Sequence, residues 1–386
     1  MIPYGKQNLT DEDVDAVLTV LKSEFLTQGP RVPQFEAKLA QEVGAKFCFA
    51  VNSATSGLHL ACLALGLGEG DWLWTSPNTF VASANCGLYC GASVDFVDID
   101  PITLNMCVAS LSAKLEIAEK VGRLPKIVVP VHFAGTPCDV AAIYQLSQKY
   151  GFKVIEDASH AVGASLGPSK VGSCEFSDIT VFSFHPVKII TTGEGGAVTT
   201  QNAELAEKIS LLRSHGITRN PSIMLEESPP PWYYEQLEVG FNYRMTDIQA
   251  ALGLSQIKQL ELFLKNRLAL AERYSISLQG LDLVLPLLDV PGRSSHHLYV
   301  VQLPDRVSRL EIFNFLRESG VGVNVHYIPV HLQPVYRLLG FSRGDFPVAE
   351  RYYNRALTLP LHPGLSFAEQ DIVINMLSQG VCSQKG

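Results

Sequence analysis

Short apolar runs alternate with segments of helical spacing between residues 45 and 200 of the chain. Strands separated by helix-length segments need crossover connections, so this pattern predicts an α/β fold with a mostly parallel sheet covered by helices on both faces. The predicted strands are 47–51, 72–75, 93–97, 127–131, 153–156, 179–183 and 197–200.

The rest of the chain predicts a large domain over 1–260 and a smaller α+β domain over 261–386. Thr10 precedes a helical pattern over 11–25 as its N-cap, and Thr246 does the same for a long pattern over 246–277 that links the domains. Further helices are predicted at 139–149, 203–213, 308–318 and 347–357, and further strands at 298–303 and 321–326. The proline-containing stretch 216–243 is too long for an ordinary connection, so we expect it to be functional or disordered.

Lys188 lies in an otherwise uncharged run between a predicted strand and a glycine-rich turn at Gly193, Gly195 and Gly196. An enclosed lysine has a lowered pKa, and its neutral amine can form a Schiff base with a carbonyl or with pyridoxal phosphate. A lone lysine at a strand end more commonly reaches water with its ammonium group. The residues upstream decide between these two interpretations.

Asp157 lies at the carboxyl end of the predicted strand 153–156, upstream of Lys188. An acid at this position in an α/β protein faces the ligand crevice. A pyridoxal cofactor needs a carboxylate opposite its ring nitrogen, and hydroxyls and free amides at a helix start, as at 52–57, form a phosphate cradle. Taken singly, Asp157 could be a helix cap and 52–57 an ordinary turn. In this order with Lys188, the three features indicate a pyridoxal phosphate site.

From Tyr4 to about Pro363 the chain resembles the sugar-nucleotide aminotransferases of fold type I, which aminate keto-sugars attached to nucleoside diphosphates. The resemblance lies in eight segments: 26–29, 52–56, 79–82, 157–161, 183–196, 213–216, 240–244 and 325–327. It implies a pyridoxal-phosphate enzyme with a large cofactor-binding domain and a small C-terminal domain.

The resemblance also implies roles for individual residues. Lys188 would be catalytic, and the cofactor would be bound by Ala54, Thr55, Phe80, Asp157, His160, Ser183, Lys188 and Asn242. The substrate would be bound by Tyr4, Glu24, Phe25, Leu26, Thr27, Ala54, Ser183, Asn242, His326, Tyr327, Ile328 and Pro329. No metal site is expected.

Four of these assignments have plain structural alternatives. Tyr4 could simply dock the N-terminal arm, and Phe80, expected to stack on the cofactor ring, could be a core residue. His160 could be a hydrogen-bonded core histidine, and Asn242 a turn residue before a helix.

The same resemblance implies that L-glutamate donates the amino group and leaves as 2-oxoglutarate. A UDP-linked 4-keto-6-deoxy-N-acetyl sugar would accept the amino group. The chain would form a homodimer in which Asn242 reaches the partner's cofactor phosphate. Relatives that act at C3 or on other 4-keto sugars share these motifs. Dehydratase relatives carry histidine in place of the lysine, so Lys188 counts against that chemistry; a cofactor-binding regulator without turnover is a third alternative.

Composition agrees with a globular enzyme, because 47% of the 386 residues are hydrophobic and 18% are charged. The net charge of −8 and the lack of a basic run argue against nucleic-acid or membrane-surface partners. The eight cysteines have no metal-binding spacing, and no signal sequence or membrane-length apolar run is evident. We therefore expect a cytoplasmic protein with reduced thiols.

Overall fold

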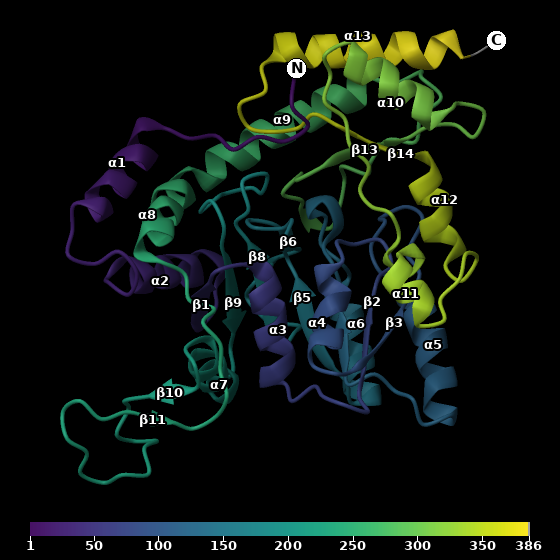
Figure 1. Ribbon diagram of the computed structural model, residues 1–386. Coiled ribbons are helices and arrows are strands. Elements are labelled where there is room, and N and C mark those ends of the chain that lie inside the picture. Colours follow the sequence, from purple (N-terminus) through teal and green to yellow (C-terminus); the bar gives the residue numbers. More distant parts are fainter. Residues whose placement is uncertain (385–386) are drawn as a thin grey trace.

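The computed structural model describes residues 1–384 and is built around a seven-stranded sheet (Figure 1). The strands lie in the order β1-β9-β8-β5-β4-β2-β3. β9 is antiparallel to both of its neighbours, and the other pairings are parallel, so the remaining strands all run one way. Their bounds are β1 Phe47–Val51, β2 Trp72–Thr75, β3 Ser93–Phe96, β4 Ile127–Val129, β5 Lys153–Asp157, β8 Ile179–Ser183 and β9 Gly196–Thr200. The predicted mostly parallel sheet is confirmed.

Successive residues of the strands enter different cores on the two faces of the sheet. Val181 packs with α3 (Ala54–Ala64), α4 (Ala82–Tyr89) and α7 (Ala203–Arg213), whereas the next residue, Phe182, packs with α2 (Arg31–Val43) and α8 (Asp247–Gln256). On this second face, α5 (Val108–Lys120) and α6 (Val140–Tyr150) enclose a further cluster around Trp74 and Val154. Helices therefore cover both faces, as expected for a parallel sheet.

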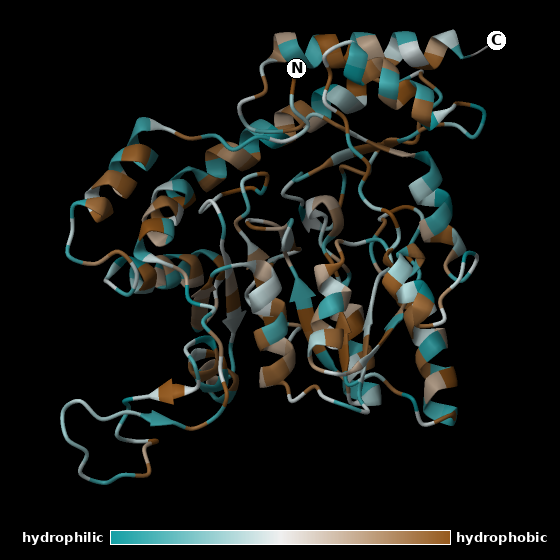
Figure 2. Ribbon diagram, in the orientation of Figure 1, coloured by the Kyte–Doolittle hydropathy of each residue, from teal (hydrophilic) through white to brown (hydrophobic). Residues whose placement is uncertain are grey.

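A smaller unit lies above the sheet in Figure 1, around the antiparallel pair β13 (Tyr299–Gln302) and β14 (Ala356–Leu359). α9 (Leu260–Ser277) joins both units, because its first turns pack in the core with Phe182 and its last turns in the core with β13 and β14. α1 (Asp11–Leu21) and α9 alternate between hydrophilic and hydrophobic residues along their length (Figure 2), as partly buried helices do. The smaller unit also contains α10 (Arg309–Glu318) and α13 (Phe367–Ser383), whereas α11 (Pro334–Leu338) and α12 (Pro347–Arg355) pack against the core of the large sheet. The division at residue 260 stays a prediction.

Several predicted boundaries are wrong. α1 ends at Leu21 rather than 25, and the 246–277 pattern is split by a 3₁₀ turn, Ile257–Gln259, into α8 and α9. The predicted N-caps Thr10 and Thr246 are confirmed, and each forms a capping box with the residue three positions on. The helix expected to reach 357 stops at Arg355, because the following residues pair as β14 with β13.

The strand expected at 321–326 is absent from the described residues. Ile2 of the N-terminal arm pairs with Val321, but Asn324 pairs with Thr358. The pairing partner thus changes within three residues, so no continuous ladder forms.

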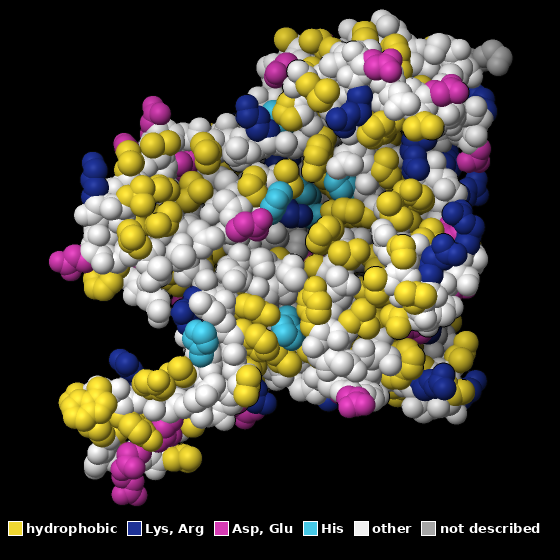
Figure 3. Space-filling model, in the orientation of Figure 1, with side chains coloured by type: hydrophobic (Ala, Val, Ile, Leu, Met, Phe, Trp, Pro, Cys, Tyr) yellow, Lys and Arg dark blue, Asp and Glu magenta, His cyan; other side chains and the backbone are white. Residues whose placement is uncertain are grey.

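Residues 216–243 leave the body as an arm that carries the short strands β10 (Ile217–Thr218) and β11 (Glu235–Gln236) (Figure 1). Trp232 on this arm is 77% exposed, and Leu225 and Val239 are exposed as well. Figure 3 shows this group of hydrophobic side chains on the projecting arm. An exposed apolar group of this kind is typical of a surface that another chain covers.

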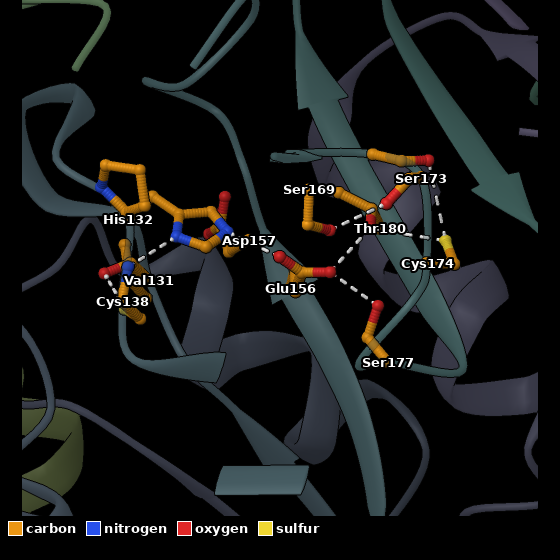
Figure 4. A network of polar contacts seen from close by, with 12 residues as sticks. Val131, His132, Cys138, Glu156, Asp157, Ser169, Ser173, Cys174, Ser177 and Thr180 are labelled. Carbon is orange, nitrogen blue, oxygen red and sulfur yellow. Dashed lines mark hydrogen bonds and ion pairs between the residues drawn. The ribbon is translucent and has the colours of Figure 1, made fainter. Parts of the chain in front are cut away.

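On the face of β5 turned away from Asp157, Glu156 is a buried carboxylate held by three donors (Figure 4). Its oxygens accept hydrogen bonds from His132 Nε2 at 2.8 Å, Ser177 Oγ at 2.5 Å and Thr180 Oγ1 at 3.0 Å. His132 Nδ1 accepts from the Cys138 amide, so the ring proton lies on Nε2 and points at Glu156. Burial raises the pKa of Glu156, but these donors outweigh it and the net pKa is lowered.

Replacing Glu156 by Ala is expected to lower the free energy of unfolding by about 3 kcal/mol or more, because three buried donors lose their acceptor. Urea unfolding of the cofactor-free protein, at one fixed protein concentration, measures the change. Glu175→Ala removes an exposed carboxylate nearby and should stay within about 0.5 kcal/mol of the unmodified protein. Equal stability of the two variants would contradict the prediction.

Candidate active site

A cavity of about 590 Å³ opens where β5 and β8 end and where the loops after β1 and β2 leave the sheet. Figure 3 shows the hollow near the centre of the molecule, with basic and histidine side chains inside it and an acidic one at its rim. Crevices at the carboxyl ends of parallel strands are where α/β proteins bind ligands. Lys188, Asp157, Ser183, Thr55, Phe80 and His326 are among its lining residues.

Lys188 is half-buried in the cavity wall, on the loop that follows β8. Its backbone N–H donates to the His185 carbonyl at 2.8 Å, which folds the loop back under the side chain. Burial lowers the pKa of the Lys188 amine to about 8, against the opposing effect of the Asp157 carboxylate. The amine is therefore partly neutral near pH 8 and available as a nucleophile.

Asp157 ends β5, and both of its carboxylate oxygens have a donor. Ser83 Oγ lies 2.6 Å from Oδ2, and the Ser159 amide donates to Oδ1 at 3.0 Å. The carboxylate is almost fully buried yet lines the cavity, so it faces whatever binds there.

The start of α3 forms a second wall of the cavity. Ser53 caps the helix by accepting a hydrogen bond from the Ser56 amide at 3.1 Å, which leaves the Ala54 and Thr55 amides at positions without an intrahelical acceptor. A side chain at Gly196 would come within 2.7 Å of the Ala54 nitrogen, so only glycine lets β9 pack this closely. Such a helix start suits an anion, in particular a phosphate.

Three buried histidines, His160, His297 and His326, line the cavity with Lys188; a fourth lining histidine, His185, is exposed. Burial, with a further contribution from the Lys188 charge, lowers the pKa of His326 to about 3 and that of His160 well below its usual value. Burial has the same effect on His297. His160 Nε2 lies 3.1 Å from the Tyr327 hydroxyl, while its buried Nδ1 has no partner. All three imidazoles are thus neutral at physiological pH.

The structure brings most of the predicted residues to this cavity. Tyr4, Ala54, Thr55, Phe80, Asp157, His160, Ser183, Lys188, His326 and Tyr327 line it. Tyr4 also docks the N-terminal arm, since its carbonyl accepts a hydrogen bond from the Leu361 amide; its role in substrate binding stays a prediction. Phe80 is 59% exposed at the rim rather than part of the core.

The other predicted residues lie outside the cavity lining of the single chain: Glu24, Phe25, Leu26, Thr27, Asn242, Ile328 and Pro329. Asn242 is exposed, and its carbonyl accepts from Asn52 Nδ2 at 3.4 Å, which places it beside the start of α3. The roles of these residues remain predictions.

Sequence reasoning gave no site role to several polar lining residues, among them Thr79, His185, Glu194, His297 and Asn324. His297 comes from the segment before β13, and its ring centroid lies 4.4 Å from that of His160 with the planes tilted by 40°. This contact between distant segments leaves no local signal in the sequence. Arg213 has a structural place instead, because it binds Glu36 Oε1 and the Ala50 carbonyl.

Residues 7–378 match the model of the DegT/DnrJ/EryC1/StrS aminotransferase family. The chain belongs to this family. It is therefore a pyridoxal-phosphate-dependent sugar aminotransferase of fold type I, as the sequence predicted.

Two curated relatives cover nearly the whole aminotransferase. It is 42% identical to the spore coat polysaccharide biosynthesis protein SpsC of Bacillus subtilis, over 97% of this chain and 95% of the relative. It is 38% identical to the UDP-4-amino-4,6-dideoxy-N-acetyl-beta-L-altrosamine transaminase of Campylobacter jejuni, over 98% and 96%.

Two solved structures are similar to the aminotransferase along its length. Helicobacter pylori PseC, an aminotransferase involved in the biosynthesis of pseudoaminic acid, has a TM-score of 0.90 and 31% identity over 99% of both chains. The PLP-form of the putative sugar aminotransferase Spr1654 from Streptococcus pneumoniae has a TM-score of 0.90 and 28% identity over 100% of both chains.

The residues in the cavity fit the family's cofactor. Pyridoxal phosphate needs an amine for its aldehyde, a carboxylate for its ring nitrogen and donors for its phosphate, and Lys188, Asp157 and the start of α3 provide these groups. The unpartnered Nδ1 of His160 leaves one further polar atom in the cavity wall. Within residues 1–384, no cluster of three metal-ligating side chains exists, and no helix has the length and apolarity to cross a membrane.

The rate at which cofactor-free protein captures pyridoxal phosphate is expected to rise with pH, to be half-maximal near pH 8 and then to level off. The reason is that only the neutral Lys188 amine attacks the aldehyde, and the pKa of this amine is about 8. Stopped-flow absorbance measures the rate. Lys188→Ala should show no captured cofactor band, whereas Lys265→Ala, which removes an exposed lysine, should behave normally. A midpoint near the ordinary lysine value would mean that the amine is not desolvated.

Proposed function

We propose that the aminotransferase converts a UDP-linked 4-keto-6-deoxy-N-acetylhexose of L-arabino configuration to UDP-4-amino-4,6-dideoxy-N-acetyl-β-L-altrosamine. L-Glutamate is the amino donor, and the step belongs to pseudaminic acid biosynthesis. The observation that carries the chemistry is a lysine of lowered pKa sharing a cavity with a buried carboxylate. The similarity to the Campylobacter transaminase and to PseC supports the sugar.

Pyridoxal phosphate supplies an electron sink that stabilises a carbanion on the amine-bearing carbon of a bound substrate. Lys188 would hold the cofactor until the donor amine displaces it. The freed amine, whose pKa is lowered to about 8 by burial, would be partly neutral and could move a proton between the donor α-carbon and the cofactor. In the second half-reaction, the same residue would move protons in the reverse order and leave an amine at C4 of the sugar.

The surrounding residues would orient the cofactor. Asp157 would keep the ring nitrogen protonated, and Phe80, at the rim of the cavity, would stack on the ring. Ala54, Thr55 and Ser183 would bind the phosphate from the start of α3 and the end of β8. His160 is neutral, so it could accept or donate one hydrogen bond to the cofactor without adding charge.

The sugar nucleotide lies on the open side of the cavity. Tyr4, His326 and Tyr327 form one wall; contacts from Ile328, which is exposed, and from Pro329, which is buried, are proposed from the family resemblance alone. The predicted contacts of 24–27 belong to the nucleotide. The volume of about 590 Å³ lies within the range of small-molecule sites.

A second candidate substrate is another nucleotide keto-sugar, aminated at C4 with different stereochemistry or at C3. The higher identity to SpsC, a spore coat polysaccharide biosynthesis protein, favours keeping this candidate. A cofactor-binding regulator without turnover is the least supported function, because the cavity combines a nucleophilic lysine with space for a ligand.

L-Glutamate is expected to abolish the absorbance band of the cofactor-loaded protein, and the UDP-4-keto-6-deoxy-N-acetyl sugar of L-arabino configuration should restore it. Each addition completes one half-reaction through Lys188. Spectra recorded after each addition make the measurement, with dTDP-linked and C3-keto sugars as matched controls. Loss of the band without recovery would support aminotransferase activity but exclude this sugar as the substrate. A band that no amino donor affects would favour the regulator.

We also propose a homodimer with shared active sites. The arm of 216–243 carries exposed apolar side chains that a second copy would cover, and Asn242 at its base is exposed. Asn242 of one protomer would then donate to the cofactor phosphate of the other. A charged acceptor makes such a hydrogen bond strong.

Asn242→Ala is expected to weaken cofactor binding about tenfold by removing this donor. The Asn242→Ala and Lys188→Ala variants are then mixed in equal amounts and allowed to exchange subunits. Half of the dimers become hybrids, and each hybrid has one intact site of two. The mixture should therefore recover about a quarter of normal activity at limiting cofactor. Asn220→Ala, on the same arm, serves as the control in the same mixture. Activity equal to the sum of the separate variants would show that the sites are not shared.

A further inference from the structure

Ser83, in the first turn of α4, is fully buried and contacts two segments that carry proposed cofactor contacts. Its Oγ lies 2.6 Å from Asp157 Oδ2, 2.7 Å from Thr79 Oγ1 and 3.3 Å from the Phe80 carbonyl. Asp157 is the proposed partner of the ring nitrogen, and Phe80 is the proposed stacking residue. No role at the site has so far been assigned to Ser83.

The direction of the hydrogen bonds follows from the number of protons. A serine hydroxyl has a single hydrogen, and an ionised carboxylate has none, so Ser83 donates to Asp157. The Ser83 oxygen can then accept from the Thr79 hydroxyl. The result is a chain from Thr79 through Ser83 to Asp157, in which each bond polarises the next.

The other carboxylate oxygen of Asp157 accepts from the Ser159 amide at 3.0 Å. Each oxygen therefore has one fixed donor, and the plane of the carboxylate cannot rotate without breaking a hydrogen bond. Each oxygen also keeps a free lone pair, which a ring N–H in the cavity can use.

We propose that Ser83 is a positioning residue that holds the Asp157 carboxylate in register with the cofactor ring and, through Thr79, ties it to the loop that carries Phe80. This inference rests on the proposed role of Asp157. Because Ser83 lies beneath the cavity wall rather than in it, Ser83 acts only through Asp157 and the Phe80 loop.

A double-mutant cycle on cofactor affinity tests the proposal, with titration of pyridoxal phosphate into cofactor-free protein followed by absorbance. Ser83→Ala should weaken binding about tenfold, because a hydrogen bond to a charged group is lost. Ser83→Thr, which keeps the hydroxyl, should stay within about threefold of the unmodified protein. In an Asp157→Ala background, Ser83→Ala should change affinity by less than about twofold, because the group it positions is gone.

Ser147→Ala is the matched control: it removes a buried helical hydroxyl that also faces a carbonyl three residues back, in α6, away from the cavity. It should leave affinity unchanged. If Ser83→Ala does not fold, as judged by urea unfolding, Ser83→Cys retains the size with a weaker donor and enters the same cycle.

A tenfold loss in both backgrounds would overturn the proposal, because Ser83 would then act independently of Asp157. No loss in either background, with a large effect of Asp157→Ala alone, would overturn the proposal but leave the role of Asp157 intact. Unchanged affinity and turnover in Asp157→Ala would overturn the proposed role of Asp157, and the inference with it.

Discussion

The enclosure of one amine next to one carboxylate is the constraint on which this structure depends. Burying Lys188 lowers the pKa of its amine, whereas the charge of Asp157 raises it, and burial is the larger effect. The amine is thereby kept close to neutral without losing its electrostatic partner. A more exposed lysine would stay protonated, and a lysine closer to the carboxylate would form an ion pair instead of a nucleophile.

The fold supplies this geometry through the direction of its strands. β5 and β8 are parallel neighbours, so Asp157 and Ser183 end at the same edge of the sheet, and the loop after Ser183 carries Lys188 back across it. On the other face of β5, Glu156 accepts three hydrogen bonds, which fixes the strand. The His132 amide in addition donates to the Asp157 carbonyl, which holds the end of the strand from which the Asp157 carboxylate projects.

The histidines give the cavity polar atoms without positive charge. A protonated His160 or His326 would repel a Lys188 ammonium, and burial already disfavours the charged rings. Neutral imidazoles can still form hydrogen bonds with hydroxyl and carbonyl oxygens, which are the polar groups of a sugar. The arm with Trp232 serves a different purpose, since its apolar side chains lie far from any core of their own chain. We regard it as part of the proposed dimer interface.

The sequence by itself determined the sheet, the capped starts of α1 and α8, and the positions of Lys188 and Asp157, because strand periodicity and strand-end residues are local signals. The family motifs added Tyr4, His160 and His326, which do line the cavity. Tertiary structure decided the rest. The His297 ring contacts His160, and Ser83 donates a hydrogen bond to Asp157, across chain separations that no local pattern reports. The stretch 321–326 failed to form a strand for the same reason: its pairing partners, Ile2 and Thr358, come from opposite ends of the chain.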